Sequence, residues 1–395
     1  MLTGISALAE RAASALVERN AVYARFFSKE ADRLAVACRE MSGRFLQGGR
    51  LVAFGRGPYA TDAQHVSVEF VHPVIVGKRA LPALDLSTLF RPWLEVIVQP
   101  QDIVMGFGPP EGDPEIDCAL QAATARGAMT FAFSGRTGSF RFDTGVTDPL
   151  QHQEMIEILY HTLWETVHVF FERQELGQDA GEAGFLYPFL GQKKQDTAGV
   201  VEEVAASIRM KVEDDARLRA QAATDQAEVL AAAVVAIDDR IERGGKLILF
   251  GNGGSATDAN DWAFDCVQPP NGRRPIPAIS LSLEPANITA LANDVGAEVI
   301  FLRQLIAQAR QEDVAIGIST SGGSRNIIMA LEEARKRDLL TIGLLGYDGG
   351  EVVRRGLADH ALVVYSDYIP RIQEVQASIY HVMTELLTER PYGEN

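Results

Sequence analysis

Two stretches of the chain decide its fold, because each is a copy of the other. Residues 50–70 read RLVAFGRGPYATDAQHVSVEF, and residues 246–266 read KLILFGNGGSATDANDWAFDC. Both run without a gap from an apolar stretch through a Gly-x-Gly turn and Ala-Thr-Asp-Ala into a segment with helical spacing. Such self-similarity predicts that the chain is a tandem repeat.

Two further pairs of segments extend the repeat. Residues 102–135 match residues 313–346 over their full length, and each reads as a strand, a loop, a helix and a second strand. QEMIEILYH at 153–161 matches QEVQASIYH at 373–381. The distance between matched segments grows along the chain, which predicts insertions in the second copy, including residues 291–296.

Alternating apolar strands and helices in each copy predict the fold class. We expect an α/β protein of two doubly wound units, each a parallel sheet with helices on both faces in three αβα layers. Each copy opens with a long helix, expected over residues 20–47 and about 220–243. The polar stretch at 191–199 suggests the boundary, so the predicted domains are residues 1–195 and 196–395.

Composition and charge restrict the classes of partner. The chain has 395 residues and a formal net charge of −16, which repels nucleic-acid backbones and anionic lipids. No apolar run reaches the roughly 20 residues that a membrane span needs, and charges at Glu10 and Arg11 interrupt any signal-peptide core. Three cysteines without a CxxC pair indicate a reducing compartment. We expect a cytoplasmic protein that binds neither nucleic acid nor membrane.

One loop of the second copy is rich in hydroxyl groups. It lies between a predicted strand and helix and holds Ser319, Thr320, Ser321 and Ser324. Hydroxyls, free N–H groups and the positive end of a helix dipole together suit a phosphate. The alternative is that these residues are ordinary helix N-caps.

The first copy has lost this chemistry. The matching positions are Gly108, Pro109, Pro110 and Asp113, which lack hydroxyls, remove N–H donors and add a negative charge. We therefore expect no phosphate at that loop.

These motifs resemble a known family. GNGGSATDA at 251–259, GISTSGGS at 317–324 and RIQEVQASIYH at 371–381 are similar to the sugar isomerase (SIS) domain, and within it to the phosphoheptose isomerases, which interconvert sedoheptulose 7-phosphate and the heptose 7-phosphate. The resemblance implies a phosphorylated sugar as ligand. It also implies a tetramer of SIS units, which a homodimer of this two-unit chain would reproduce.

The family also carries a His and a Glu four residues apart, then a Gln and a His eight apart on the last helix. The first copy keeps this set as His65, Glu69, Gln153 and His161. The resemblance implies that the four hold a divalent metal, with zinc expected, and that Glu69 and His161 are the acid and base. Two imidazoles and one carboxylate suit zinc. Eight residues span about 12 Å of helix, however, so Gln153 and His161 can hardly share one ion. The alternatives are a surface pair for His65 and Glu69 and a core histidine for His161.

The second copy has Asp261, Asp265, Gln373 and His381 at these positions. For the two aspartates, a solvated helix face and a metal site both stay open. Because one copy keeps the acid/base set and the other keeps the hydroxyl loop, we expect a composite site built from both repeats. The expected substrate-binding residues are Ser255, Ser319, Thr320, Ser321 and Ser324 for phosphate, and Asn293, Asp294, Gln373 and His381 for the sugar.

The resulting functional hypothesis is a sugar-phosphate aldose/ketose isomerase of the phosphoheptose isomerase type, acting through an enediol. The alternative is a noncatalytic phosphosugar-binding or protein-interaction module, since SIS relatives include such proteins and both copies have lost part of the motif.

Overall fold

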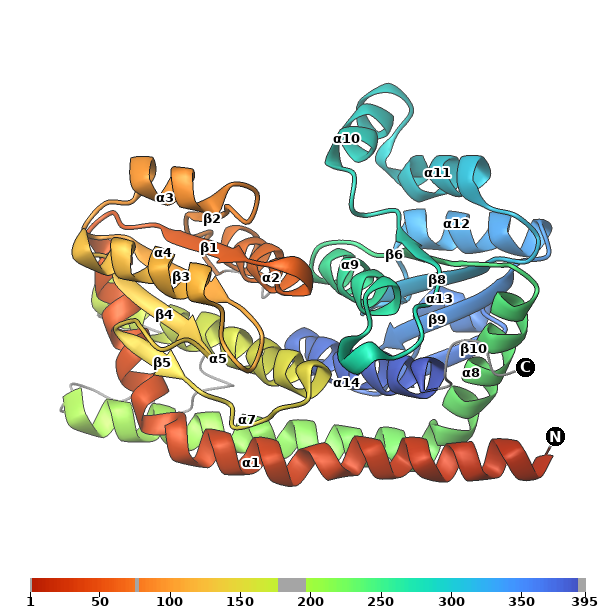
Figure 1. The fold of residues 1–395 in the computed structure, drawn as a ribbon, viewed down its shortest axis with the longest axis horizontal. Coiled ribbons are helices and arrows are strands. Elements are labelled where there is room, and N and C mark those ends of the chain that lie inside the picture. The colour runs from red at the N-terminus through yellow and green to blue at the C-terminus, as the bar shows by residue number, and fades with distance from the viewer. Residues whose placement is uncertain (1, 75–77, 177–196, 390–395) are drawn as a thin grey trace. The chain divides into compact units, whose positions relative to one another are not determined.

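The computed structural model describes residues 2–74, 78–176 and 197–389 (Figure 1). Within these ranges the chain forms two five-stranded sheets, each in its own compact unit. One unit comprises Ala21–Asp214, and the other comprises Met1–Asn20 together with Asp215–Asn395. All strand pairs are parallel, so the predicted α/β tandem repeat is confirmed.

The sheet of the first unit has the strand order β2-β1-β3-β4-β5. Its strands are β1 (Leu51–Gly55), β2 (Ala83–Asp85), β3 (Ile103–Phe107), β4 (Met129–Phe133) and β5 (Phe140–Phe142). Its helices are α1 (Leu2–Leu46), η1 (Gly57–Tyr59), α2 (Ala60–Val71), α3 (Phe90–Ile97), α4 (Pro114–Ala125), α5 (Pro149–Leu176) and α7 (Thr197–Asp225), of which α1 and α7 continue into the second unit.

The sheet of the second unit has the order β10-β9-β8-β6-β7, which is the same topology. Its strands are β6 (Leu247–Phe250), β7 (Ala278–Ser280), β8 (Val314–Ser319), β9 (Leu340–Gly346) and β10 (His360–Val364). Its helices are α8 (Ala227–Glu242), α9 (Gly254–Val267), η3 (Pro270–Gly272), α10 (Pro285–Asp294), η4 (Ala297–Val299), α11 (Ile300–Gln308), α12 (Arg325–Lys336), α13 (Gly350–Arg354) and α14 (Ile369–Thr388).

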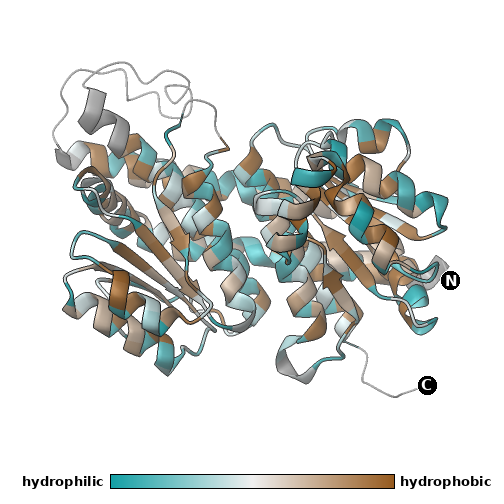
Figure 2. Cartoon of the chain, turned by 90° about the horizontal axis from the view of Figure 1, so that it is seen from above, coloured by the Kyte–Doolittle hydropathy of each residue, from teal (hydrophilic) through white to brown (hydrophobic). Residues whose placement is uncertain are grey.

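Apolar residues on both faces of each strand explain the three layers. In β6, Leu247 and Leu249 enter one core cluster, whereas Ile248 and Phe250 enter another, because successive side chains of a strand point to opposite faces. Strand β1 divides in the same way. Figure 2 shows the strands of both sheets as predominantly hydrophobic. A parallel sheet buried on both faces requires this continuous apolar pattern.

The opening helices are distributed differently from the expected domains. Ala12 and Leu16 of α1 pack in the core of the C-terminal unit, and Val204 and Ile208 of α7 pack in the core of the N-terminal unit. Each long helix is thus divided between the two units, at residues 20/21 and 214/215. The expected boundary at 195/196 lies outside the described residues. The second opening helix is also interrupted, because α7 ends at Asp225 and α8 starts at Ala227.

The predicted insertion in the second copy is confirmed. Between β7 and β8 the chain forms α10, η4 and α11, where the first copy has only α3 between β2 and β3 among its described residues. Helix α10 contains no buried residue and carries the expected sugar contacts Asn293 and Asp294.

Candidate functional site

The hydroxyl loop joins the end of β8 to the start of α12. Ser324 occupies the N-cap position of α12, but its side chain makes no capping hydrogen bond. Its hydroxyl oxygen instead lies 3.5 Å from that of Ser319, which accepts a bond from the Gly322 N–H at 3.1 Å. The Ser321 hydroxyl accepts from the Gly323 N–H at 3.2 Å. The hydroxyls therefore shape the loop and leave the helix N-terminus open, which favours anion binding over simple capping.

A second Gly-rich turn supplies the neighbouring helix start. Gly253 precedes α9 with φ 57° and ψ −126°, a conformation open to glycine. Ser255 lies in the first turn of α9 and is buried. The side chains of Asn252 and Asn326 donate to each other reciprocally at 2.9 Å, which joins this turn to the first turn of α12. Sequence reasoning missed this pair, although Asn252 lies inside the Gly-rich motif.

Gly322 holds the hydroxyl loop in its shape. Its φ is +58°, and a Cβ built on it would lie 2.1 Å from the carbonyl oxygen of Gly349. We expect Gly322→Ala to destabilise the protein by about 1–3 kcal/mol in urea unfolding and to weaken phosphosugar binding. Gly323→Ala is the matched control, because the nearest atom to its Cβ would be 3.7 Å away. Equal stability of the two variants would contradict the prediction.

The equivalent loop of the first copy is closed by an ion pair. The Asp113 carboxylate caps α4 by accepting from the Glu115 and Ile116 N–H groups at 2.8 and 3.3 Å. Its other oxygen lies 2.7 Å from Nη1 of Arg56. A carboxylate therefore occupies the helix N-terminus where a phosphate would bind, which supports the prediction that residues 108–113 hold none.

A buried histidine also restrains this loop. Burial lowers the pKa of His152 to about 4, so its imidazole is neutral at physiological pH. Its Nε2 donates to the Gly108 carbonyl at 3.1 Å, while Nδ1 lies 2.8 Å from the Thr144 hydroxyl. His152 thus has a structural role in the first copy.

Three of the four expected metal ligands of the first copy meet in space. His65 and Glu69 lie one turn apart on α2, and His161 lies on α5. Nε2 of His65 is 3.3 Å from Nε2 of His161 and 3.8 Å from Oε1 of Glu69. All three side chains are buried, with Glu69 only 1% exposed, so the surface-pair alternative is wrong.

Gln153 makes a different contact. Its side-chain amide donates to the Thr61 hydroxyl at 3.2 Å, at the start of α2. Gln153 and His161 are about two helical turns apart on α5, and that they do not share one ion stays a prediction.

The second copy gathers a chemically different group. Asp261 and Asp265 on α9 face His381 on α14, with carboxylate oxygens 3.4 and 3.2 Å from Nε2. Both aspartates are buried, so the solvated-face alternative is wrong. Gln373, two turns earlier on α14, is also buried. His381, expected to contact substrate, thus lies against two carboxylates.

Both groups fit a metal ion by their donor chemistry. The three donor atoms of His65, Glu69 and His161 lie within 4.8 Å of one another, as do those of Asp261, Asp265 and His381. The first group offers two imidazole nitrogens and one carboxylate, a donor set typical of zinc sites.

Asn293 and Asp294, the expected sugar contacts, are hydrogen-bonded to each other and to neither of these groups in the described contacts. Both are exposed at the end of α10, where Asn293 donates to Asp294 at 2.8 Å, and α10 itself packs on η4 and α11. Their expected role with sugar hydroxyls stays a prediction.

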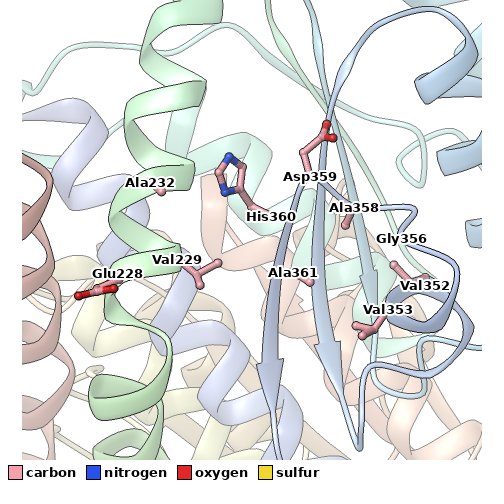
Figure 3. A pocket seen from close by; sticks show the side chains of 10 residues that line it. All are labelled: Glu228, Val229, Ala232, Val352, Val353, Gly356, Ala358, Asp359, His360 and Ala361. Carbon is pink, nitrogen blue, oxygen red and sulfur yellow. The ribbon is translucent and has the colours of Figure 1, made fainter. Parts of the chain in front are cut away.

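A groove of about 520 Å³ lies elsewhere, between α8 and the start of edge strand β10. Figure 3 shows the ring of His360 directed from β10 toward α8. Ligands of parallel α/β sheets bind at the carboxyl ends of the strands. His360 is at the amino end of β10, so the groove lies at the end of the sheet where such ligands do not usually bind. The groove includes none of the predicted site residues.

Comparison with known proteins assigns the family. The SIS domain model matches residues 212–346, which carry both Gly-rich loops of the second copy. The phosphoheptose isomerase of a Nitratiruptor species is 48% identical over 145 residues, which are 36% of this chain and 76% of that protein. The chain belongs to the phosphoheptose isomerase family of SIS-domain proteins.

A second family member extends the match. The phosphoheptose isomerase of Leptospira biflexa serovar Patoc is 39% identical over 189 residues, covering 96% of its length and 47% of this chain. A family member of ordinary length thus corresponds to about half of this two-repeat chain.

A solved structure matches the whole SIS tandem in fold. The C-terminal domain of glucosamine-fructose-6-phosphate aminotransferase from Francisella tularensis has a TM-score of 0.62, covering 95% of each chain at 8% identity. At that identity the likeness concerns the fold alone.

Among the described residues, no helix is long and apolar enough to cross a membrane.

Proposed function

We propose that this protein is a sugar-phosphate isomerase of the phosphoheptose isomerase type. The observation that carries the proposal is the 48% identity to a phosphoheptose isomerase across three quarters of that protein. The geometry agrees, since one repeat presents an open hydroxyl loop and the other a buried His–Glu–His group. A phosphorylated sugar is the proposed substrate.

Aldose–ketose isomerisation moves a proton between adjacent carbons through an enediol. We assign this transfer to Glu69, whose carboxylate can accept the proton from one carbon and return it to the next. Its burial beside His65 excludes water from that exchange. The hydroxyls of Ser319, Thr320, Ser321 and Ser324, with Ser255, are the proposed phosphate contacts.

We further propose that His65, Glu69 and His161 hold a divalent cation, with zinc as the ion their donors favour. When bound, such an ion stabilises negative charge on the enediolate oxygens. His161 then cannot be both a metal ligand and an acid through the same atom. Its Nε2 faces Nε2 of His65 and has one lone pair, which binds either a cation or a proton. His161 can be an acid through Nε2 only without the ion, so Glu69 is the main proton carrier. That the loop and the His–Glu group act on one substrate stays a prediction.

The test is an activity screen of the purified full chain. Sedoheptulose 7-phosphate and other ketose and aldose phosphates are incubated with the protein, with and without added zinc, and aldose–ketose conversion is followed by NMR. We expect conversion of at least one of them. Tight binding without conversion of any heptose, hexose or pentose phosphate would contradict the proposal.

That contrary result would support the second candidate, a noncatalytic phosphosugar-binding or protein-interaction module. One observation favours it: Asp113 and Arg56 close the first repeat's loop, so that repeat has lost its own phosphate contact.

We also propose that the chain forms a homodimer, which would assemble four SIS units. Light scattering at micromolar concentration is expected to give twice the 43.0 kDa chain mass. A monomeric mass would contradict this proposal.

We also propose a cytoplasmic location. Cys38, Cys118 and Cys266 are free thiols, which agrees with a reducing compartment.

A further inference from the structure

We propose that Asn326 is a positioning residue of the phosphate site, which acts by joining the Gly-rich turn before α9 to the hydroxyl loop before α12. This role rests on the proposed binding of phosphate at the hydroxyl loop, and does not depend on turnover. Asn326 acts through Asn252 and is given no contact of its own with the ligand. The pair of side chains holds two loops, which follow different strands, in one arrangement.

The two asparagine side chains form a closed pair. Nδ2 of Asn252 donates to Oδ1 of Asn326 at 2.9 Å, and Nδ2 of Asn326 donates back to Oδ1 of Asn252 at the same distance. Oδ1 of Asn326 also accepts from the N–H of Ile327 at 3.0 Å. Because only the amide oxygen can accept, this third bond sets the orientation of the Asn326 amide. The backbone of α12 therefore orients the whole pair.

The pair connects two helix starts that both have hydrogen-bonding capacity to spare. Ser255, in the first turn of α9, is 5% exposed, and no described residue forms a hydrogen bond with its hydroxyl. Ser324, at the N-cap position of α12, makes no capping bond. A buried hydroxyl without a partner is unfavourable, so a ligand oxygen is its expected partner. A phosphate that meets both helix starts requires them at a fixed separation, which the asparagine pair maintains.

The other side of the hydroxyl loop is held by the backbone. The Val352 N–H donates to the Gly322 carbonyl at 3.1 Å, and the Gly322 N–H donates to the Ser319 hydroxyl at the same distance. Loss of the asparagine pair would therefore free the loop on the side of α9 alone. We expect such a loss to affect ligand affinity more than the stability of the fold.

The first repeat has charged residues at the same two positions. In the repeat alignment Arg56 corresponds to Asn252, and Glu115 corresponds to Asn326. Nη1 of Arg56 lies 3.7 Å from Oε1 of Glu115 and 2.7 Å from Oδ2 of Asp113, the carboxylate that closes that loop. Both repeats thus link the two loops, but the link is uncharged where the loop is open. A neutral pair leaves the positive ends of both helices available to an anion.

The test measures the affinity of the full chain for inorganic phosphate, followed by ³¹P NMR. Asn252→Ala, Asn326→Ala and the double variant form a double-mutant cycle. We expect Asn326→Ala to weaken phosphate binding by about 10-fold, because it removes both bonds of the pair. The double variant is expected to bind within about 2-fold of the weaker single variant, since either substitution alone already breaks the pair. Gln311→Ala, which removes an exposed amide in the loop before β8, is the control and is expected to change nothing.

A conservative variant separates positioning from a general loss of stability. Asn326→Gln keeps an amide on a longer side chain that can still reach Asn252, so we expect phosphate affinity within about 3-fold of the unaltered chain. Thermal unfolding of every variant is measured, and phosphate is titrated well below the unfolding temperature, where a merely structural role would leave affinity unchanged.

Three results would overturn the proposal: no phosphate binding by the unaltered chain, unchanged affinity in Asn326→Ala, or losses in the two alanine variants that multiply in the double variant. Phosphate binding that follows the expected cycle, in a chain that isomerises no sugar phosphate, would support the role of Asn326 and contradict only the isomerase activity.

Discussion

Glu69→Gln is expected to lower kcat by about 10²–10⁴-fold while phosphosugar affinity stays nearly unchanged. The substitution keeps the side chain's shape but removes the charge that accepts the proton. Glu69 is 1% exposed and lies 3.8 Å from His65. We therefore expect no rearrangement that brings another base into the place of its carboxylate. Steady-state kinetics give kcat, and calorimetry with a phosphosugar gives the affinity.

Two controls make this result specific. The assay is run at saturating zinc and the bound metal is measured, because glutamine is also a weaker metal ligand than glutamate. Asp265→Asn is expected to change kcat much less, since it alters the group of the other repeat. A Glu69→Gln enzyme with full turnover would remove Glu69 from the mechanism.

Ser321→Ala combined with Ser324→Ala is expected to weaken phosphosugar binding by about 10²–10⁴-fold. Each lost hydrogen bond to a charged phosphate contributes about 1.5–3 kcal/mol. Ser321 is exposed and Ser324 makes no capping bond to α12. The double variant removes one loop bond, from the Gly323 N–H to the Ser321 hydroxyl, so we expect the loss of stability to be small beside the loss of binding. Calorimetric titration with a sugar phosphate or inorganic phosphate measures the change, and thermal unfolding checks the fold.

The matched control changes the other repeat. Pro109→Ala lies in the loop whose helix N-terminus is capped by Asp113, and is expected to leave phosphate affinity unchanged. Equal loss in both variants would show that the two loops were assigned to the wrong repeats.

The sequence by itself determined the repeat and the α/β class. Apolar runs such as 247–250 must be buried on both faces, which requires a parallel sheet between helices, and the matched motifs place the loops at strand ends. The spacing of His65 and Glu69 also fixes them on one face of a helix, since four residues make about one turn.

Other features depended on the tertiary structure because they join residues distant in the chain. Periodicity cannot say which core a long helix enters, so the division of α1 and α7 between the units was not foreseeable. The sequence did not decide whether Asp261 and Asp265 are buried against His381, because a solvated helix face and a metal site were both compatible with two aspartates four residues apart. Nor did it indicate the Asn252–Asn326 pair. Local pattern specifies elements, whereas the packing of α9 on α14 decides which polar groups lose their water and must find a partner or an ion.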